Sequence, residues 1–504
     1  MTGRRATAAA LAAVVALLAA GCGGIPGSVT SVDEPGFTRE LPVPPLAESR
    51  VVDGVRTFRL TAQEGTTELL PGVETRTQGY DGAYLGPTLR AERGEKVSVE
   101  VTNALDETTT VHWHGMHLPA AMDGGPHQPV EPGATWRPTW AIDQPAATLW
   151  YHPHPHGETE AQVYRGLAGL FLLDDDASRA ADLPREYGVD DVPVVVQDKV
   201  LDDDGQLVLD HDGGEPGTLG GTVVTNGVAG AYQRVTTERV RLRLVNGSTA
   251  RTYALGFGDR DLDLVATDGG LLDAPVRLDR VRLAPGERAE VVVVMKPGET
   301  TRLRSFEADL GGVAVPFAMG GNDAFDVLEL RAADRLAPSP APAWEPSEHA
   351  AGDALHEGDA TVTRTFDLAE RTINGETMDT GRIDEVAVVG TTEVWEVRNT
   401  VPMPHSFHVH DVQFRVLTVD GEAPPPELAG RKDTVYLEPR RTYRLLMRFD
   451  DYADDVRPYM YHCHMLLHED EGMMGQLLVV EPGSTARPGP SERLAGHDGG
   501  HGHG

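Results

Sequence analysis

Cysteine is scarce in this sequence, with only Cys22 and Cys463 among 504 residues. At most one disulfide can form, so a fold stapled by several bridges is excluded. Positive charge is also scarce, since 44 Lys and Arg stand against 78 Asp and Glu and give a formal net charge of −34. So acidic a chain is unsuited to polyanions, and we expect no nucleic-acid partner.

Long apolar runs are missing except at the N-terminus. Arg4 and Arg5 precede an apolar run over residues 6–20, a pattern typical of an export signal and short for a membrane span. The following letters, LAAGC, resemble a bacterial lipoprotein processing site with Cys22 as the lipidated residue. We therefore expect an exported cell-surface or periplasmic lipoprotein that meets the membrane only through this lipid. The paired arginines suggest the twin-arginine route, although the residues after Arg5 depart from its usual motif.

Three segments repeat one pattern, an alternating apolar strand that ends in asparagine. They are EKVSVEVTN (95–103), ERVRLRLVN (238–246) and TEVWEVRN (392–399), and a proline turn and a second apolar strand follow each. Alternation with a period of two, broken by turns, is typical of β-sandwiches. With 36 Pro and 56 Gly in the chain, the sequence predicts an all-β protein of three sandwich domains.

Shifts in composition predict the limits of these domains. We expect little helix, with a short one near Ala177 or Leu466. The predicted parts are an export signal (1–22), a flexible tether (23–45), domain 1 (46–176), domain 2 (177–335), a linker (336–359), domain 3 (360–482) and a histidine-containing tail (483–504).

Histidines gather in the two outer domains as four His-x-His pairs, whereas domain 2 has only His211. The pairs are His112/His114, His152/His154, His408/His410 and His462/His464. Residues i and i+2 of a strand face the same side, so each pair offers two imidazoles to one site. A lone histidine in a sandwich is usually structural, but four such pairs are not expected by chance. They predict an interdomain cleft that holds several copper ions.

The stretch YHCHMLLHEDEGMMG (461–475) adds a different ligand set. A thiolate beside imidazoles, with a thioether available, is typical of a blue-copper electron-transfer centre. If Cys22 is lipidated, Cys463 has no disulfide partner, and binding a metal would remove the liability of a free thiol.

Taken in order over about residues 57–480, these motifs make the chain resemble the three-domain bacterial multicopper oxidases, both laccase-like and cuprous-oxidase-like members. The resemblance implies three cupredoxin-like Greek-key β-sandwich domains and four copper ions. It implies that His112 and His408 bind the type 2 copper. It implies that the type 3 pair is held by His114, His152, His154, His410, His462 and His464. It implies that the type 1 copper is held by His405, Cys463 and His468, with Met473 as a weak axial ligand.

The resemblance also implies the reaction. Four one-electron oxidations of a reducing substrate at the type 1 copper would be coupled to reduction of dioxygen to two waters at the type 2/type 3 cluster. Cys463 would pass electrons to its sequence neighbours, the cluster ligands His462 and His464. Asp123 and Glu469 match acidic residues that the family places beside the cluster, where carboxylates can supply protons.

The remaining histidines and aromatics are given smaller roles. His156 extends the second pair to HPHPH and is expected outside the ligand set or at the surface. His117 and His127 are expected on loops near the cleft, and Trp150 and Tyr151 beside the cluster. The tail histidines His497, His501 and His503 are expected to be solvated, with copper scavenging as the alternative.

The substrate is predicted from what is missing. Cuprous-oxidase relatives carry a methionine-rich insertion and an acidic residue just before the first type 1 histidine. Residues 399–404 (NTVPMP) contain no acid, and the chain has only 12 methionines. Phenols or aromatic amines are therefore the predicted substrates, with Cu(I) oxidation for copper tolerance as the alternative.

Two rival classes fit the sequence less well. A copper nitrite reductase usually has two domains and fewer histidine pairs, and a copper-free envelope scaffold would have eroded ligands. Three sandwich domains suffice to build both copper sites, so we expect a monomer.

Overall fold

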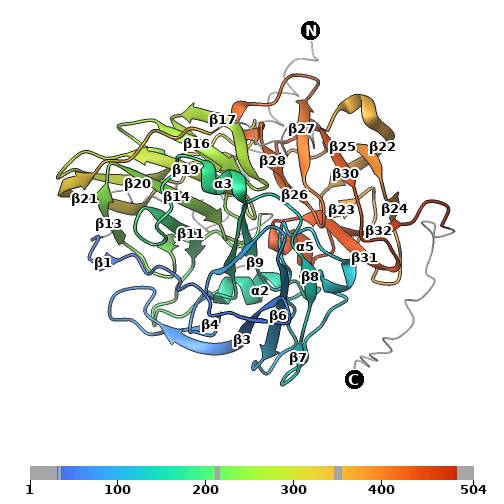
Figure 1. Cartoon of the computed structure of the whole chain (residues 1–504), viewed down its shortest axis with the longest axis horizontal. Helices are drawn as coiled ribbons and strands as arrows, with labels where there is room; N and C mark the ends of the chain where they lie inside the picture. Colours follow the sequence, from blue (N-terminus) through green and yellow to red (C-terminus); the bar gives the residue numbers. More distant parts are fainter. Residues whose placement is uncertain (1–30, 32–35, 210–215, 345–354, 485–504) are drawn as a thin grey trace, which may run out of the picture.

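The computed structural model describes residues 31, 36–209, 216–344 and 355–484. Six sheets form three β-sandwiches that follow one another along the chain. In Figure 1 the first is blue to teal, the second green to yellow, and the third orange to red. The predicted all-β architecture of three sandwiches is confirmed. The predicted export signal, including Cys22, and the tail histidines lie outside the described residues.

The first sandwich contains a sheet in the order β2-β3-β6-β7, with β4 beside β3 and β8 beside β6, and a second sheet in the order β5-β10-β9. Its strands are β2 (Arg50–Val52), β3 (Val55–Thr67), β4 (Thr75–Tyr80), β5 (Leu89–Glu92), β6 (Lys96–Asn103), β7 (Thr135–Trp136), β8 (Thr139–Ala141), β9 (Thr148–Tyr151) and β10 (Gly169–Asp174).

The second sandwich contains sheets in the orders β12-β11-β14-β19-β16-β17 and β1-β13-β21-β20-β15-β18. Its strands are β1 (Arg39–Glu40), β11 (Asp191–Lys199), β12 (Thr222–Thr225), β13 (Ala231–Thr237), β14 (Arg239–Asn246), β15 (Tyr253–Phe257), β16 (Leu262–Thr267), β17 (Gly270–Leu278), β18 (Arg280–Leu283), β19 (Arg288–Val294), β20 (Thr300–Phe306) and β21 (Phe325–Ala337).

The third sandwich contains sheets in the orders β23-β22-β25-β30-β27-β28 and β24-β32-β31-β26-β29. Its strands are β22 (Ala360–Ala369), β23 (Thr372–Ile373), β24 (Glu385–Val388), β25 (Thr391–Asn399), β26 (His405–Val409), β27 (Phe414–Val419), β28 (Arg431–Lys432), β29 (Thr434–Leu437), β30 (Thr442–Phe449), β31 (Asp454–Cys463) and β32 (Met474–Val480).

The prediction of a flexible tether over residues 23–45 is wrong for its C-terminal part. Strand β1 pairs in parallel with β13 at the edge of the second sandwich. The Arg39 guanidinium also donates a 3.1 Å hydrogen bond to the carbonyl of Ala229. An edge strand offers unpaired backbone groups, and this segment satisfies them. At the other end of the domain, β21 continues to Ala337, two residues into the predicted linker. The other limits drawn from composition stay predictions.

Helix is scarce, as predicted. Helices α3 (Asp176–Ala180) and α5 (Leu466–Asp470) lie at the two places where a short helix was expected. Helix α2 (Thr159–Arg165) was not predicted, although Gly166 ends it at φ 123°, a conformation that favours glycine. Among the described residues, no helix is long and apolar enough to cross a membrane.

The predicted repeat extends to side-chain hydrogen bonds. In each sandwich the strand that ends in asparagine, β6, β14 or β25, pairs in parallel with β3, β11 or β22. The amide of Asn246 donates to the carbonyls of Arg251 and Leu283, and its oxygen accepts from the amide of Ser248. Asn103 and Asn399 make equivalent sets. Each asparagine therefore fixes the turn that leads out of its strand.

We predict that Asn246→Ala destabilises the second sandwich, because three buried backbone groups lose their partner. The free energy of unfolding should fall by roughly 1–3 kcal/mol, measured from the urea midpoint of that domain's transition. The exposed Asn322 provides the control substitution, Asn322→Ala, which should leave the midpoint unchanged. Equal midpoints for both variants would contradict the role of Asn246.

Candidate metal centre

One strand pair in the third sandwich supplies two groups of candidate ligands. Strands β26 and β31 are antiparallel, with Phe407 opposite Cys463 and His408 opposite His462. Side chains alternate along a strand, so Cys463 faces the core with Phe407, and the two histidines face the opposite side. The sheet therefore separates a sulfur-containing group from a histidine group by one backbone thickness.

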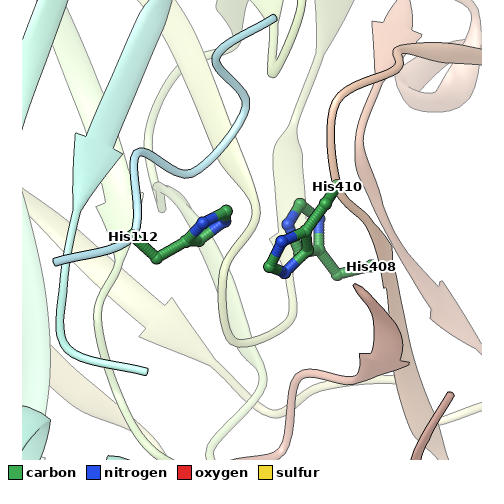
Figure 2. Close-up of side chains that lie close together, drawn as sticks. All are labelled: His112, His408 and His410. Carbon is green, nitrogen blue, oxygen red and sulfur yellow. The ribbon is translucent and has the colours of Figure 1, made fainter. Parts of the chain in front are cut away.

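The first sandwich presents its two histidine pairs side by side. His112 and His152 form an antiparallel bridge, in which His112 N donates to His152 O at 2.8 Å and His152 N donates to His112 O at 3.2 Å. Figure 2 shows His112 reaching from one side toward His408 and His410, which come from the facing sandwich. The four pairs thus converge at the boundary of the first and third sandwiches.

Eight buried histidines form three nitrogen groups, each drawn from both sandwiches. Within a group the ligand atoms lie within 4.8 Å of one another. The groups are His112, His408 and His410; His114, His152 and His464; and His154, His410 and His462. All eight residues are at most 1% exposed.

Cys463 anchors a fourth group on the core side of the sheet. Its Sγ lies 3.6 Å from His405 Nδ1 and 3.5 Å from His468 Nδ1, and these two nitrogens are 3.2 Å apart. Met473 is buried in the same core, and its carbonyl accepts a 3.0 Å hydrogen bond from the amide of Cys463. The predicted Cys-His-His set is therefore assembled, with the thioether residue held beside it.

The geometry of these groups fits metal ions. His154 Nε2 and His410 Nε2 each lie 3.3 Å from His462 Nε2. Two imidazole nitrogens bound to one ion at about 2.0 Å in tetrahedral geometry would be about 3.3 Å apart. His112 Nε2, His408 Nε2 and both ring nitrogens of His464 are buried and have no hydrogen-bond partner among the described residues. Imidazoles with a thiolate and a thioether suit copper.

Burial keeps seven of these histidines neutral, as metal ligands must be. Burial and neighbouring imidazoles hold the pKa well below its ordinary value in His114, His152, His154, His405, His408 and His464. Burial lowers the pKa of His410 to about 3, despite the opposing charge of Asp123. Burial raises the pKa of the Cys463 thiol to about 12, so a metal ion would have to displace its proton.

Asp123 lies where the sequence placed it, beside the first histidine group. Its Oδ2 accepts a hydrogen bond from His410 Nδ1 at 2.8 Å, and its Oδ1 lies 3.4 Å from His112 Nδ1. Burial alone would raise the pKa of Asp123, but the two imidazoles hold it below its usual range. Asp123 therefore links one histidine of each sandwich.

Glu469 makes the corresponding bridge at the third histidine group. Its Oε1 lies 3.1 Å from His154 Nδ1, and its Oε2 lies 3.1 Å from His462 Nδ1. Since it follows His468 in α5, Glu469 connects the cysteine group to the histidine cluster.

For the other residues named from the sequence, the position in the strand decides whether the side chain faces the cluster. The ring of Trp150 lies 4.3 Å from that of His152, beside the cluster as expected. Tyr151 points the other way into the core of the first sandwich, where its ring packs 5.2 Å from Tyr80, so its predicted place is wrong. His156 is exposed, which leaves His152 and His154 as the inward pair.

The two remaining loop histidines lie between the first and third sandwiches, as expected. His117 bridges Asp411 Oδ1 at 2.8 Å and Asp451 Oδ1 at 2.7 Å. The ring of His127 contacts Gln476 of β32.

Two acidic residues at the centre were missed. Asp433 is fully buried, and its Oδ1 lies 3.0 Å from His114 Nε2. Asp470 accepts from the amides of Thr159 and Glu160 at 2.9 and 2.8 Å, tying α5 to α2. Neither stands at a distinctive spacing from a histidine, so only the fold reveals them.

Comparisons with known proteins agree with this geometry. Three family models described as multicopper oxidase match residues 61–178, 210–302 and 353–483. The chain is 35% identical over 452 residues to multicopper oxidase mco of Staphylococcus epidermidis, covering 88% of this chain and 92% of that one. It is 37% identical over 453 residues to cell division protein FtsP of Escherichia coli, covering 88% and 93%.

Among solved structures, a multi-copper oxidase from Pediococcus acidilactici superposes with a TM-score of 0.79 at 34% identity, covering 92% of this chain and 95% of that one. A laccase-like CueO from Ochrobactrum sp. superposes with a TM-score of 0.79 at 36% identity, covering 87% and 100%. The cupredoxin-like fold implied by the motifs is confirmed, and the chain belongs to the multicopper oxidase family.

Proposed function

We propose that the protein is a laccase-type oxidase, which takes single electrons from phenols or aromatic amines and reduces dioxygen to two waters. One observation carries the proposal. A buried Cys-His-His group and a buried cluster of eight histidines lie on opposite faces of one sheet, joined through His462-Cys463-His464. Copper bound in these groups would supply one-electron redox chemistry, which four substrate molecules and one dioxygen require.

The ligand roles follow the four groups. His405, Cys463 and His468, with Met473 as a weak fourth ligand, would hold one type 1 copper. His112 and His408 would hold a type 2 copper. The type 3 pair would be held by His114, His152 and His464 on one side and His154, His410 and His462 on the other.

Two carboxylates are proposed to supply protons. Reduction of dioxygen to two waters consumes four protons, and Asp123 and Glu469 are two buried acids that each contact cluster histidines. Each can hold or pass a proton through an imidazole Nδ1 without leaving its place.

The substrate class rests on the surroundings of His405 and His468. Both residues are at most 1% exposed, so a donor in solvent does not contact either ring. A donor must then pass its electron through the protein atoms that cover these two rings. An aromatic donor can do this without binding the metal. Direct Cu(I) capture needs soft ligands, and the approach over residues 399–404 offers only Met403.

Location and assembly are proposed from the chain itself. The N-terminal pattern favours export, through the twin-arginine route, and lipid attachment at Cys22. Every residue of the four ligand groups comes from one chain, which favours a monomer.

The similarity to cell division protein FtsP raises a second class, a cell division protein that serves as a copper-free scaffold. Such a protein has no need of intact ligands. Here all four ligand groups are assembled and buried, and this favours an oxidase.

Initial rates of oxygen uptake by the copper-loaded protein test the substrate class. With equal donor concentrations, an aromatic amine should be oxidised faster than chelated Cu(I), because the buried type 1 ligands accept electrons without capturing a metal. Protein stripped of copper is the control for both donors. Faster Cu(I) oxidation would contradict the aromatic substrate and support a role in copper tolerance.

Cys463→Ser should abolish the blue absorption and all donor oxidation while the chain still folds, because serine offers no thiolate for the type 1 copper. Visible absorption, donor oxidation and circular dichroism measure these three properties. Cys22→Ser, at the only other cysteine, is the matched control and should stay blue. Retained turnover in Cys463→Ser would remove Cys463 from the electron path.

Asp123→Asn should leave reduction of the type 1 copper by the donor intact but slow oxygen consumption roughly a hundredfold or more, because an amide cannot supply the proton. Stopped-flow bleaching of the blue band and oxygen uptake separate the two steps. Asp106→Asn, on the exposed surface of the same sandwich, is the control. Unchanged oxygen uptake would exclude Asp123 from proton supply.

A further inference from the structure

We propose that Arg288 of the second sandwich is a positioning residue for the histidine cluster and acts through Asp433. The inference rests on the proposed function, in that the cluster is taken to hold copper. It gives the second sandwich, which contributes none of the candidate ligands, a specific part in building the site.

Asp433, together with the neighbouring Thr434 hydroxyl, fixes the orientation of two cluster histidines from different sandwiches. His114 Nε2 donates to Asp433 Oδ1 at 3.0 Å, which leaves His114 Nδ1 facing His152 Nε2 at 3.3 Å. His408 Nδ1 donates to the Asp433 carbonyl at 2.8 Å, which leaves His408 Nε2 turned to the cluster. The hydrogen bond on one ring nitrogen thus determines which nitrogen each histidine presents to a metal.

Arg288 holds the Asp433 carboxylate from the other side. Both atoms Nη1 and Nη2 donate to Asp433 at 2.6 Å, one to each carboxylate oxygen. Arg288 Nε donates to the Thr148 carbonyl of the first sandwich at 3.0 Å. A planar, two-pronged contact fixes the carboxylate in position and in rotation, which a single ammonium cannot do.

The pair is embedded in further buried charges. The Arg288 amide donates to Asp268 Oδ1 at 2.7 Å, and Lys432 Nζ lies 2.9 Å from Asp268 Oδ2 and 3.2 Å from Glu287 Oε1. Burial would lower the pKa of Arg288, but the charges of Asp433 and Asp268 outweigh it and keep the guanidinium charged. Breaking such a buried pair from one side leaves an uncompensated charge.

The first sandwich makes room for this pair at Gly115, directly after His114. A Cβ atom at Gly115 would lie 2.5 Å from Asp433 Oδ2 and 2.7 Å from Arg288 Nη2. The glycine of the HWHG motif is therefore required by the Arg288–Asp433 contact. The motif glycine, the arginine and the aspartate come from three different sandwiches and meet at one point.

The residues just before Arg288 in the second sandwich contact the cluster at two further points. The Ser406 hydroxyl donates to the Pro285 carbonyl at 3.0 Å. A Cβ at Gly286 would lie 2.9 Å from the ring of His464. Residues 285–288 therefore form one wall of the histidine cluster.

The test is Arg288→Lys, which keeps the charge and loses the two-pronged contact. Arg251→Lys is the matched control, because Arg251 is an equally buried arginine of the same sandwich that pairs with Asp198 at 2.8 Å and Asp323 at 2.6 Å. Copper per chain, the type 2 electron paramagnetic resonance signal and the blue absorption are measured on purified, copper-loaded proteins.

In Arg288→Lys we expect affinity for the type 2 copper to fall roughly 10–100-fold, as for other residues that orient metal ligands. The reason is that Asp433 also holds the proposed type 2 ligand His408, through its carbonyl at 2.8 Å and with its carboxylate 3.7 Å away. The type 2 signal should weaken or change shape while the blue absorption stays. Asp433→Asn preserves the shape of the side chain but weakens its contact with Arg288, so it should give the same selective change. This second variant keeps the test valid if Arg288→Lys does not fold.

Full type 2 copper with an unchanged signal in both variants would overturn the inference. So would equal loss of blue and type 2 copper, or the same loss in Arg251→Lys, because either result means a general effect on stability. Wild-type protein that binds no copper would instead overturn the proposed function, so the two failures are distinguishable.

Discussion

The antiparallel pairing of β26 with β31 is the constraint on which the site depends. With Phe407 opposite Cys463 and His408 opposite His462, the sheet sends sulfur to one face and imidazoles to the other. A shift of one residue in this register would turn the ligands of the shifted strand to the wrong face. The same pairing makes the covalent path between the two groups as short as the backbone allows, because His462, Cys463 and His464 are consecutive.

The rest of the molecule brings the other candidate ligands to this sheet and buries them away from solvent. The first sandwich adds four histidines through the His112–His152 bridge. Asp123 and Glu469 join histidines of both sandwiches, and the Arg288–Asp433 pair brings in the second sandwich. Each sandwich has its own hydrophobic core, and smaller apolar clusters at the boundaries act with these polar and ionic contacts to hold the ligands of different sandwiches together.

Local patterns predicted much of this structure. The strands ending in Asn103, Asn246 and Asn399 identified three sandwiches, because alternation and a buried asparagine are local properties. The His-x-His pairs and the cysteine between two histidines identified the ligands for the same reason. Two features that were wrong or missed depend on long-range packing: β1 pairs with a strand far along the chain, and Asp433 meets His114 only in the folded protein. The error at Tyr151 is local, because it follows Trp150 in one strand and neighbouring side chains face opposite sides.

The most direct test of this account is to count copper ions per chain and record the visible spectrum of the same purified sample. The four buried ligand groups predict four copper ions, with an intense blue band from the Cys463 thiolate. One copper ion or none, or four without the blue band, would contradict the account, because the histidine cluster or the cysteine group would then not hold the metal that its geometry fits.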